Sequence, residues 1–330
     1  MRKIALEEAV AVPGQRDLVP GGRSSFEYQA MMPVYEQLVD IAGERLRHMD
    51  AGGVAISVLS VTAPGAQGIP ADRDAAGLVT GWNDYLAAAV DGHADRFACF
   101  AALPMRDPDA AVRELRRCVG ELGFVGALVN GYDDGDGSSG PLYYDAPAYL
   151  LFWQCVEELG VPVYLHPRSV PSGRVTAYRG YPQLNGAAWG FHVETAEHVL
   201  RLILSGLFDR CPRLQVIIGH MGEFLPWWSW RLDHRLSRDP GEKLPLARTV
   251  TEYLRENLFI TTSGYFDTPA LEHALDVVGA ERVLYSVDYP YESCEEAGTW
   301  FDKLDLPEDV HEKIAYSNAA RLLRLDRPCS

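Results

Sequence analysis

Eight short apolar runs alternate with stretches of helical periodicity along the chain, and this alternation restricts the fold more than any other feature of the sequence. Runs of Val, Ile and Leu this short, bounded by Gly and Pro, are typical of strands buried on both faces. Eight such strands separated by helices predict a parallel (β/α)8 barrel. The predicted strands span residues 4–8, 54–59, 97–102, 125–129, 161–166, 214–219, 258–262 and 283–287.

No linker-like change in composition divides the chain, so we interpret residues 1–330 as a single barrel domain. An apolar fraction of 47% supports a large core. Residues 11–34, rich in Pro, Gly, Arg and aromatics, form a long loop insertion of the kind that usually serves a site or an interface. Helices are predicted over residues 35–51, 71–92, 107–122, 147–159, 189–208 and 225–236, with Asp107 as an N-cap.

Charge and cysteine usage restrict the partners and the compartment. The net charge of −16, from 30 Lys and Arg against 46 Asp and Glu, argues against a nucleic-acid partner. The six cysteines lack the close pairs of a zinc site or a redox motif. We find neither a signal peptide nor the roughly 18 apolar residues of a membrane span. We therefore expect a cytoplasmic protein with free thiols and no membrane partner.

Four of the predicted strands end in a group that can bind a metal or carry a proton. Glu7, His166, His220 and Asp288 follow strands 1, 5, 6 and 8. In (β/α)8 barrels the reactive groups gather at the carboxyl ends of the strands, so these four are expected to meet. Glu7, His166 and Asp288 form a candidate site for Zn²⁺, Mn²⁺ or Mg²⁺ with positions open for water or substrate.

Each of these residues also has an ordinary structural interpretation. A strand-end histidine is more often hydrogen-bonded within the fold than bound to metal, and a strand-end aspartate often caps the next helix. A glutamate near the N-terminus is usually solvated. Their coincidence on one face of a barrel favours the functional interpretation.

The run over residues 213–219 stops on glycine and delivers His220 and Glu223, which are three residues apart. If the chain turns helically there, the two side chains can pair, and the carboxylate would fix the imidazole tautomer and raise its pKa. Arg231, on the following helix beside Trp227, Trp228 and Trp230, is a candidate for binding a substrate carboxylate. We expect the tryptophans to be packed; alone, Arg231 is more often a surface arginine.

The remaining histidines fall within or beside predicted helices, and we interpret them as structural, with His192 and His234 the least secure. The acidic stretch at 133–140 resembles a calcium loop superficially. It lacks the terminal glutamate at the required spacing, so we interpret it as a surface loop.

Taken together, the motifs resemble the amidohydrolase-related (amidohydrolase 2) family of metal-dependent, non-oxidative aromatic acid decarboxylases, which includes γ-resorcylate and 2,3-dihydroxybenzoate decarboxylases. The resemblance runs nearly end to end, and the set of motifs is more specific than any one of its members. It rests on Ala-Leu-Glu-Glu at 5–8, Gly-Phe-Val-Gly-Ala-Leu-Val-Asn-Gly at 123–131, Pro-Leu-Tyr-Tyr-Asp at 141–145, Tyr-Leu-His-Pro-Arg at 164–168, Gly-His-Met-Gly-Glu at 219–223, Trp-Arg-Leu-Asp-His-Arg at 230–235, Ile-Thr-Thr-Ser-Gly at 260–264 and Ser-Val-Asp-Tyr-Pro-Tyr-Glu at 286–292.

This resemblance implies a role for each matching residue. Glu7, His166 and Asp288 correspond to metal ligands, and His220 with Glu223 corresponds to the acid/base pair. Arg231 and Asn130 belong to the substrate pocket. The resemblance also implies a homodimer or homotetramer, with residues 11–34 as candidates to reach a neighbouring pocket.

One position departs from the pattern. Many relatives have Glu-Glu-His after the first strand, where the histidine is a further ligand, but this chain has Ala9. The resemblance therefore implies that water or substrate takes that coordination position, as in the dihydroxybenzoate-type branch. The departure affects metal affinity and metal identity more than the reaction. Aminocarboxymuconate semialdehyde decarboxylases are also similar, but they usually have His-x-His there.

The implied reaction is reversible decarboxylation of an ortho-hydroxybenzoate, such as a dihydroxybenzoate, resorcylate, salicylate or orsellinate-like acid, with one divalent metal ion and Asp288 as the proton donor. Loops 11–34, 62–70 and 170–190 are expected to contact the ring substituents. The alternative is a metal-dependent hydrolase of a lactone or amide, in which Asp288 or His220 activates a metal-bound water. A barrel kept only for binding is a third and weaker alternative. The product distinguishes the first two: CO2 from an aromatic acid, or a new acid group.

Overall fold

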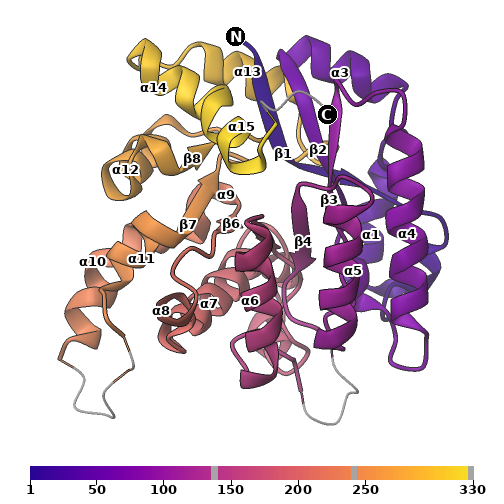
Figure 1. Ribbon diagram of the computed structural model, residues 1–330, viewed down its shortest axis with the longest axis horizontal. Coiled ribbons are helices and arrows are strands. Elements are labelled where there is room, and N and C mark those ends of the chain that lie inside the picture. The colour runs from indigo at the N-terminus through magenta and orange to yellow at the C-terminus, as the bar shows by residue number, and fades with distance from the viewer. Residues whose placement is uncertain (135–139, 239–243, 245, 326–330) are drawn as a thin grey trace.

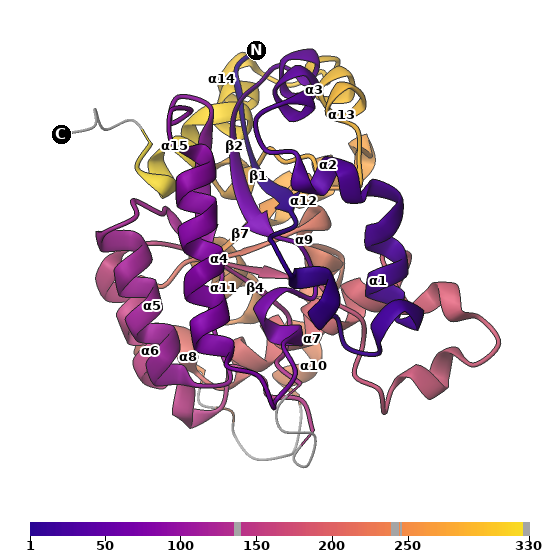
Figure 2. The ribbon, with the colours of Figure 1, turned by 90° about the vertical axis from the view of Figure 1, so that its right-hand side faces the viewer.

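The chain forms a (β/α)8 barrel, as predicted, in a computed structural model that describes residues 1–134, 140–238, 244 and 246–325. Eight parallel strands follow one another around one sheet in sequence order, and helices cover its outside (Figures 1 and 2). The strands are β1 (Lys3–Val10), β2 (Val54–Val61), β3 (Phe97–Ala101), β4 (Gly126–Asn130), β5 (Val163–His166), β6 (Val216–Ile218), β7 (Leu258–Thr261) and β8 (Val283–Leu284).

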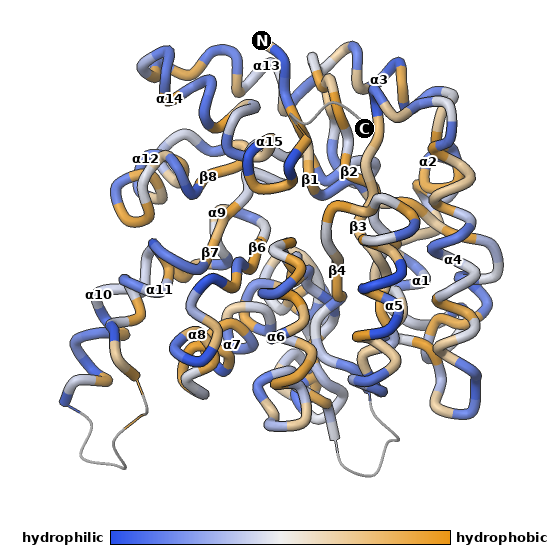
Figure 3. Tube along the Cα trace, in the orientation of Figure 1, coloured by the Kyte–Doolittle hydropathy of each residue, from blue (hydrophilic) through white to orange (hydrophobic). Residues whose placement is uncertain are grey.

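The strands are buried on both faces because side chains alternate between two apolar layers. Leu6, Phe100, Leu128, Tyr164 and Ile217 belong to one cluster that fills the inside of the barrel. The side chains on the other face pack against the helices in a larger second cluster. The hydropathy trace accordingly shows apolar stretches along the strands and polar stretches on the outer helices (Figure 3).

Individual hydrogen bonds join the first and last strands, since β8 is only two residues long. The backbone N–H of Ala9 donates to the carbonyl of Tyr289 at 2.7 Å. The Ser286 hydroxyl accepts from the N–H groups of Leu6 and Glu7 at 3.1 and 2.7 Å. These bonds hold the end of β1 beside the residues that follow β8.

Each of the six predicted helices has a counterpart in the structure, and two of them are interrupted. Asp107 caps α5 as expected, because its carboxylate accepts from the N–H groups of Asp109 and Ala110. The helices are α1 (Phe26–Met31), α2 (Tyr35–Val39), α3 (Glu44–Gly52), α4 (Ala75–Val90), α5 (Pro108–Gly120), α6 (Leu150–Leu159), α7 (Gly190–Leu204), α8 (Leu207–Arg210), α9 (His220–Glu223), α10 (Leu225–Leu236), α11 (Val250–Asn257), α12 (Thr268–Val278), α13 (Cys294–Asp302), α14 (Glu308–Glu312) and α15 (Asn318–Leu323).

Three predictions about chain segments need correction. The helix predicted over 35–51 is broken between α2 and α3, where Asp40 accepts from the N–H groups of Gly43 and Arg45 at 2.9 and 2.8 Å. The helix over 189–208 is interrupted at Gly206, which has a left-handed φ of 72°. The segment 11–34 is not a plain loop, because it contains α1 and short 3-10 turns. The calcium-like stretch lies largely outside the described residues.

The prediction that the tryptophans of α10 are packed is wrong. Trp227, Trp228 and Trp230 are 56, 59 and 68% exposed. The buried side of this helix is formed instead by Leu225, Pro226 and Ser229, so the tryptophans point outward. Within the part of the chain that the structure describes, no helix combines the length and the apolar character needed to cross a bilayer.

Candidate active site

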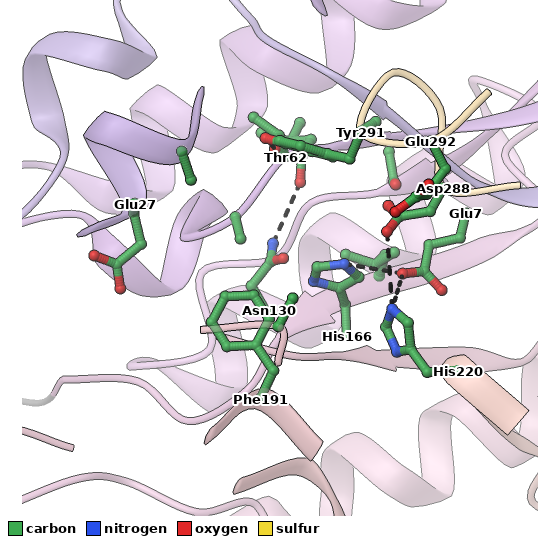
Figure 4. Close-up of a pocket in the computed structure, with 17 residues that line it drawn as sticks. Glu7, Glu27, Thr62, Asn130, His166, Phe191, His220, Asp288, Tyr291 and Glu292 are labelled. Carbon is green, nitrogen blue, oxygen red and sulfur yellow. Dashed lines mark hydrogen bonds and ion pairs between the residues drawn. The ribbon is translucent and has the colours of Figure 1, made fainter. Parts of the chain in front are cut away.

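A cavity opens at the carboxyl ends of the strands, where the sequence predicted the reactive groups (Figure 4). One side carries the charged residues Glu7, His166, His220 and Asp288. Apart from the carboxylates of Glu27 and Glu292, the remaining walls are apolar or carry uncharged polar groups. They are formed by Ala9, Glu27, Ala30, Ser60, Val61, Thr62, Ala63, Leu128, Asn130, Ala187, Phe191, Tyr291 and Glu292. The loops 11–34, 62–70 and 170–190 all contribute to this lining, as expected.

Four strand ends bring their charged side chains together around one oxygen of Glu7. Oε1 of Glu7 lies 3.1 Å from Nε2 of His166 and 3.4 Å from Nε2 of His220. Nε2 of His220 also lies 3.8 Å from Oδ2 of Asp288. The sequence therefore predicted correctly that these four residues meet.

The other oxygen of Glu7 is fixed by two hydroxyl groups from inside the barrel. Tyr164 and Ser263 both donate to Oε2, and the bond from Ser263 is 2.5 Å long. Thr261 links the two hydroxyls at 2.9 and 2.8 Å. A side chain on Gly219 would place its first carbon 2.7 Å from Oε2, so only glycine lets the end of β6 pass this carboxylate.

Burial and the neighbouring charges oppose one another within this cluster. Burial raises the pKa of Glu7, but His220 and His166 outweigh it and bring the pKa down to about 2. Burial also raises the pKa of Asp288, to about 6, although His220 opposes the rise. For His220, burial lowers the pKa, but Glu223 and Glu7 outweigh it and raise the pKa well above its ordinary value. The cluster thus combines an ionised carboxylate with groups able to hold protons near neutral pH.

His220 and Glu223 form the pair that their spacing predicted, with Nδ1 of His220 2.7 Å from Oε1 of Glu223. The turn between them is left-handed, with φ values of 50° at His220 and 52° at Glu223. Non-glycine residues with positive φ are strained, and such strain is concentrated at functional sites. Asp288 has the same property, with φ of 79°.

His192 is a residue of this site that we had assigned to a structural role. Its Nδ1 lies 2.5 Å from Oε2 of Glu223, so the buried carboxylate bridges two imidazoles. Burial raises the pKa of Glu223, but the charge of His220 and the bonds to both imidazoles outweigh it and lower the pKa. The only indication in the sequence was that the helix carrying His192 lies between predicted strands 5 and 6.

Two residues assigned to the substrate pocket have different outcomes. Asn130 lines the cavity, and its side-chain oxygen is buried without a hydrogen-bond partner among the described residues. Arg231 instead is exposed on α10, and it is not part of the lining. The sequence could not reveal this, because the orientation of α10 depends on which of its faces packs.

Sequence reasoning also missed several lining residues. Tyr291 and Glu292 follow Asp288 by three and four positions, and the hydroxyl of Tyr291 lies 2.7 Å from that of Thr62. Glu27 comes from α1, inside the 11–34 insertion. The insertion was flagged by its length, but nothing in its composition indicated which side chain faces the cavity.

The donor set fits a divalent metal ion. Oε1 of Glu7 is buried and lacks a hydrogen-bond partner among the residues that the structure describes, although two imidazole nitrogens lie near it. One atom each from Glu7, His220 and Asp288 lie close enough together to hold a single ion. Carboxylate oxygens with imidazole nitrogen suit Zn²⁺, Mn²⁺ or Mg²⁺. Ala9 also lines the cavity.

Comparisons with known proteins point to one family. A family model described as Amidohydrolase matches residues 34–325. Gamma-resorcylate decarboxylase of Rhizobium sp. (strain MTP-10005) is 46% identical, over 98% of each chain. The crystal structure of 2,6-dihydroxybenzoate decarboxylase from Rhizobium has 45% identity and a TM-score of 0.91, covering 99% of this chain and 100% of that one. A dihydroxybenzoic acid decarboxylase from Polaromonas sp. JS666, solved with bound manganese and the inhibitor 2-nitroresorcinol, has 43% identity and a TM-score of 0.91, covering 99% and 98%.

Proposed function

Because the chain belongs to the amidohydrolase family, we propose that it is a metal-dependent decarboxylase that converts an ortho-hydroxybenzoate reversibly to the phenol and CO2. The observation that carries this proposal is the cluster of Glu7, His166, His220 and Asp288 at one side of the cavity. The match to dihydroxybenzoate and resorcylate decarboxylases over nearly the whole chain supports the same reaction.

Glu7, His166 and Asp288 would hold the metal ion, one per subunit. His220, which also lies close to Glu7 and Asp288, would stay a proton carrier because its other nitrogen is bonded to Glu223. The ion would neutralise the carboxylate and phenolate oxygens of the acid and so fix the ring in the pocket. Two features of the chain support this assignment. Among the described residues, Oε1 of Glu7 has no hydrogen-bond partner, and the hydroxyls of Tyr164 and Ser263 orient the same carboxylate. Such supporting bonds hold metal ligands in position.

Asp288 is the proposed proton donor. In its protonated form it delivers a proton to the ring carbon that bears the carboxylate. The bond to that carboxylate then breaks, and its electron pair restores the aromatic ring as CO2 leaves.

His220 and Glu223 would return a proton to Asp288 after each turnover. Nε2 of His220 lies 3.8 Å from Oδ2 of Asp288, and its Nδ1 is bonded to Glu223. Asn130 is the proposed contact for a substrate hydroxyl, because its unpaired buried oxygen can accept a hydrogen bond. Leu128 and Phe191 supply apolar surface for the ring.

The test is decarboxylation of 2,6-dihydroxybenzoate by protein reconstituted with Mn²⁺ or Zn²⁺, with the phenol and CO2 both quantified. Asp288→Asn should abolish release, and para-hydroxybenzoate, which cannot chelate through adjacent oxygens, should react poorly. In concentrated bicarbonate the enzyme should carboxylate resorcinol. Metal-loaded protein that releases no CO2 from any ortho-hydroxybenzoate, yet opens a lactone or amide, would favour the hydrolase.

We further infer that the chain works as a homodimer or homotetramer in the cytoplasm. The exposed tryptophans of α10 form an aromatic surface of the kind that subunit interfaces cover. Arg231 lies on the same helix, so it could meet a substrate only in the pocket of a second copy. The segment 11–34 contributes Glu27 and Ala30 to the pocket of its own chain, and its reach towards a neighbouring pocket stays a prediction.

Light scattering on a sizing column should give a dimer or a tetramer, and Trp228→Ser should shift it towards monomer. A wild-type protein that elutes as a monomer at micromolar concentration would refute the oligomer.

The proposed location in the cytoplasm is supported by the cysteines. The five described cysteines are free and buried, which is typical of proteins in a reducing compartment. Cys329 lies outside the described residues.

A further inference from the structure

The cavity carries negative charge at both of its ends. Four carboxylates line it, those of Glu7, Glu27, Asp288 and Glu292, and among the described residues the lining contains no lysine or arginine. Glu7, Asp288 and Glu292 lie on the side of the proposed metal site, whereas Glu27 lies across the cavity from them (Figure 4). An aromatic acid bound between the two sides would therefore meet Glu27 with its far edge.

Glu27 is the one charged group that α1 adds to this wall. Its neighbour along the helix in the cavity lining is Ala30, which is too small to shield it. Among the described residues, Glu27 has no hydrogen bond or ion pair that would occupy its carboxylate. A carboxylate that faces a substrate cavity without a partner is an acceptor available to the ligand.

Arg168 is a cation near Glu27, but it does not occupy the Glu27 carboxylate. The pKa of Arg168 is lowered by burial, but neighbouring charges, including that of Glu27, outweigh this and raise it. The two terminal nitrogens of the guanidinium nevertheless donate to other acceptors, and its Nε–H has no partner among the described residues. It donates to the carboxylate of Asp134 at 3.0 Å and to the carbonyls of Tyr132 and Gln67 at 3.0 and 3.2 Å. Arg168 therefore offsets part of the charge of Glu27 without bonding to it.

We propose that Glu27 selects the substrate: it accepts a hydrogen bond from a hydroxyl on ring carbon 4 or 5 and rejects acids that carry a second carboxylate there. This inference rests on the proposed function, because it places the reacting carboxylate and its ortho hydroxyl at the Glu7, His166 and Asp288 side. Carbons 4 and 5 are then the ring positions that face away from that side. A phenol hydroxyl can donate to a carboxylate, whereas a second carboxylate would meet Glu27 as a like charge with no cation in the lining to separate them.

The same arrangement explains why the position of a second hydroxyl should matter. A hydroxyl on carbon 6 lies next to the reacting carboxylate, so it stays on the metal side and gains nothing from Glu27. A hydroxyl on carbon 4 or 5 replaces a bond to water with a charge-assisted bond inside the pocket. Salicylate, which has neither, is the reference acid.

The experiment compares kcat/KM for five acids with metal-loaded protein. They are salicylate, 2,4-, 2,5- and 2,6-dihydroxybenzoate, and 4-hydroxyisophthalate, which is salicylate with a second carboxylate on carbon 5. Wild-type protein should prefer the 2,4 or the 2,5 isomer to salicylate at least about tenfold and should turn over 4-hydroxyisophthalate at least about tenfold more slowly. Glu27→Ala should bring both ratios to within about threefold of one.

Two further variants separate this role from a general effect on folding. Glu27→Gln keeps an acceptor oxygen but removes the charge, so it should retain part of the hydroxyl preference while accepting 4-hydroxyisophthalate. Glu36→Ala removes an exposed carboxylate from α2 of the same region, outside the cavity lining, and should leave both ratios unchanged. Ratios in Glu27→Ala that equal those of the wild type would overturn the proposal.

Calorimetric binding of the same acids keeps this test independent of turnover. If binding shows the hydroxyl preference and Glu27→Ala removes it, the selection by Glu27 stands even where no CO2 is released, and only the decarboxylation fails. If 2,6-dihydroxybenzoate is turned over but neither kcat/KM nor binding favours a hydroxyl on carbon 4 or 5, the decarboxylation stands and the selection by Glu27 is refuted.

Discussion

Replacing Tyr164 by phenylalanine should weaken metal binding although Tyr164 is not itself a proposed ligand. The change removes one hydroxyl from the barrel interior and leaves the ring packed in the inner cluster. That hydroxyl donates to Oε2 of Glu7, while Oε1 faces His166 and His220. Without it, the Glu7 carboxylate has less to hold it in the orientation that presents Oε1.

The structure sets the size of this effect. A hydrogen bond to a charged group contributes about 1.5 to 3 kcal/mol, which corresponds to about 10- to 150-fold in an equilibrium constant. Ser263 still donates to the same oxygen at 2.5 Å, so part of the orientation survives. We therefore expect the dissociation constant for Mn²⁺ or Zn²⁺ to rise about 10- to 30-fold, near the lower end of that range and within the usual effect of losing a bond that supports a metal ligand.

Metal affinity can be measured directly by competition with a chelating dye, without reference to turnover. Tyr285→Phe is the matched control, because its hydroxyl is also fully buried but has no hydrogen-bond partner in the described part of the chain. This variant should bind metal as the wild type does. A Tyr164→Phe protein with an affinity within twofold of the wild type would show that the hydroxyl does not orient Glu7 for metal binding.

Three other substitutions give separate tests. Glu223→Gln should lower kcat about 100-fold and leave the metal content unchanged, because it removes the charge that holds His220 while the proposed ligands stay intact; an equal loss of bound metal would contradict this. Ala9→His should tighten metal binding about tenfold in the same dye assay, since it adds a nitrogen beside Glu7 in the cavity lining. Burial lowers the pKa of His198 to about 3, so the folded protein keeps this imidazole neutral while the unfolded chain takes up a proton below about pH 6.5. The stability that depends on it is complete above pH 6.5 and decreases as the pH falls towards 3, by about 2 kcal/mol at pH 5. In urea unfolding, the stability gap between wild type and His198→Gln should therefore narrow by that amount from pH 7 to pH 5.

The sequence predicted the barrel and the identity of its strands because burial on both faces leaves a strong local signal. Val216–Ile218 is apolar at every position, and all three residues are fully buried. Breaks within helices were harder to predict, because one side chain can cause them. The N–H groups of Gly43 and Arg45 donate to the Asp40 carboxylate and separate α2 from α3, although the apolar spacing of the sequence continues across this point.

The same distinction applies to the candidate site. Glu7, His166, His220 and Asp288 could be predicted, because parallel strands in one barrel bring their carboxyl ends to one face. The contribution of Glu27 could not, since it depends on a short helix within an insertion. The prediction for Trp227, Trp228 and Trp230 was wrong for a related reason. Hydrophobicity predicts that a side chain tends to be covered, but it does not say whether the same chain or a second one would cover it.

The metal side of the cavity and the Glu27 side are held by different parts of the fold, so each can change without the other. The proposed metal ligands are fixed by the barrel itself, through the bonds between the end of β1 and the residues after β8 and through hydroxyls inside the barrel. Glu27 lies in the first turn of α1 and takes part in none of those hydrogen bonds. Substitutions in α1 can therefore alter which ring is accepted without disturbing the groups that would bind the metal and deliver the proton. Substitutions at Tyr164 or Ser263 should have the opposite effect, because they alter the orientation of Glu7 for every acid alike.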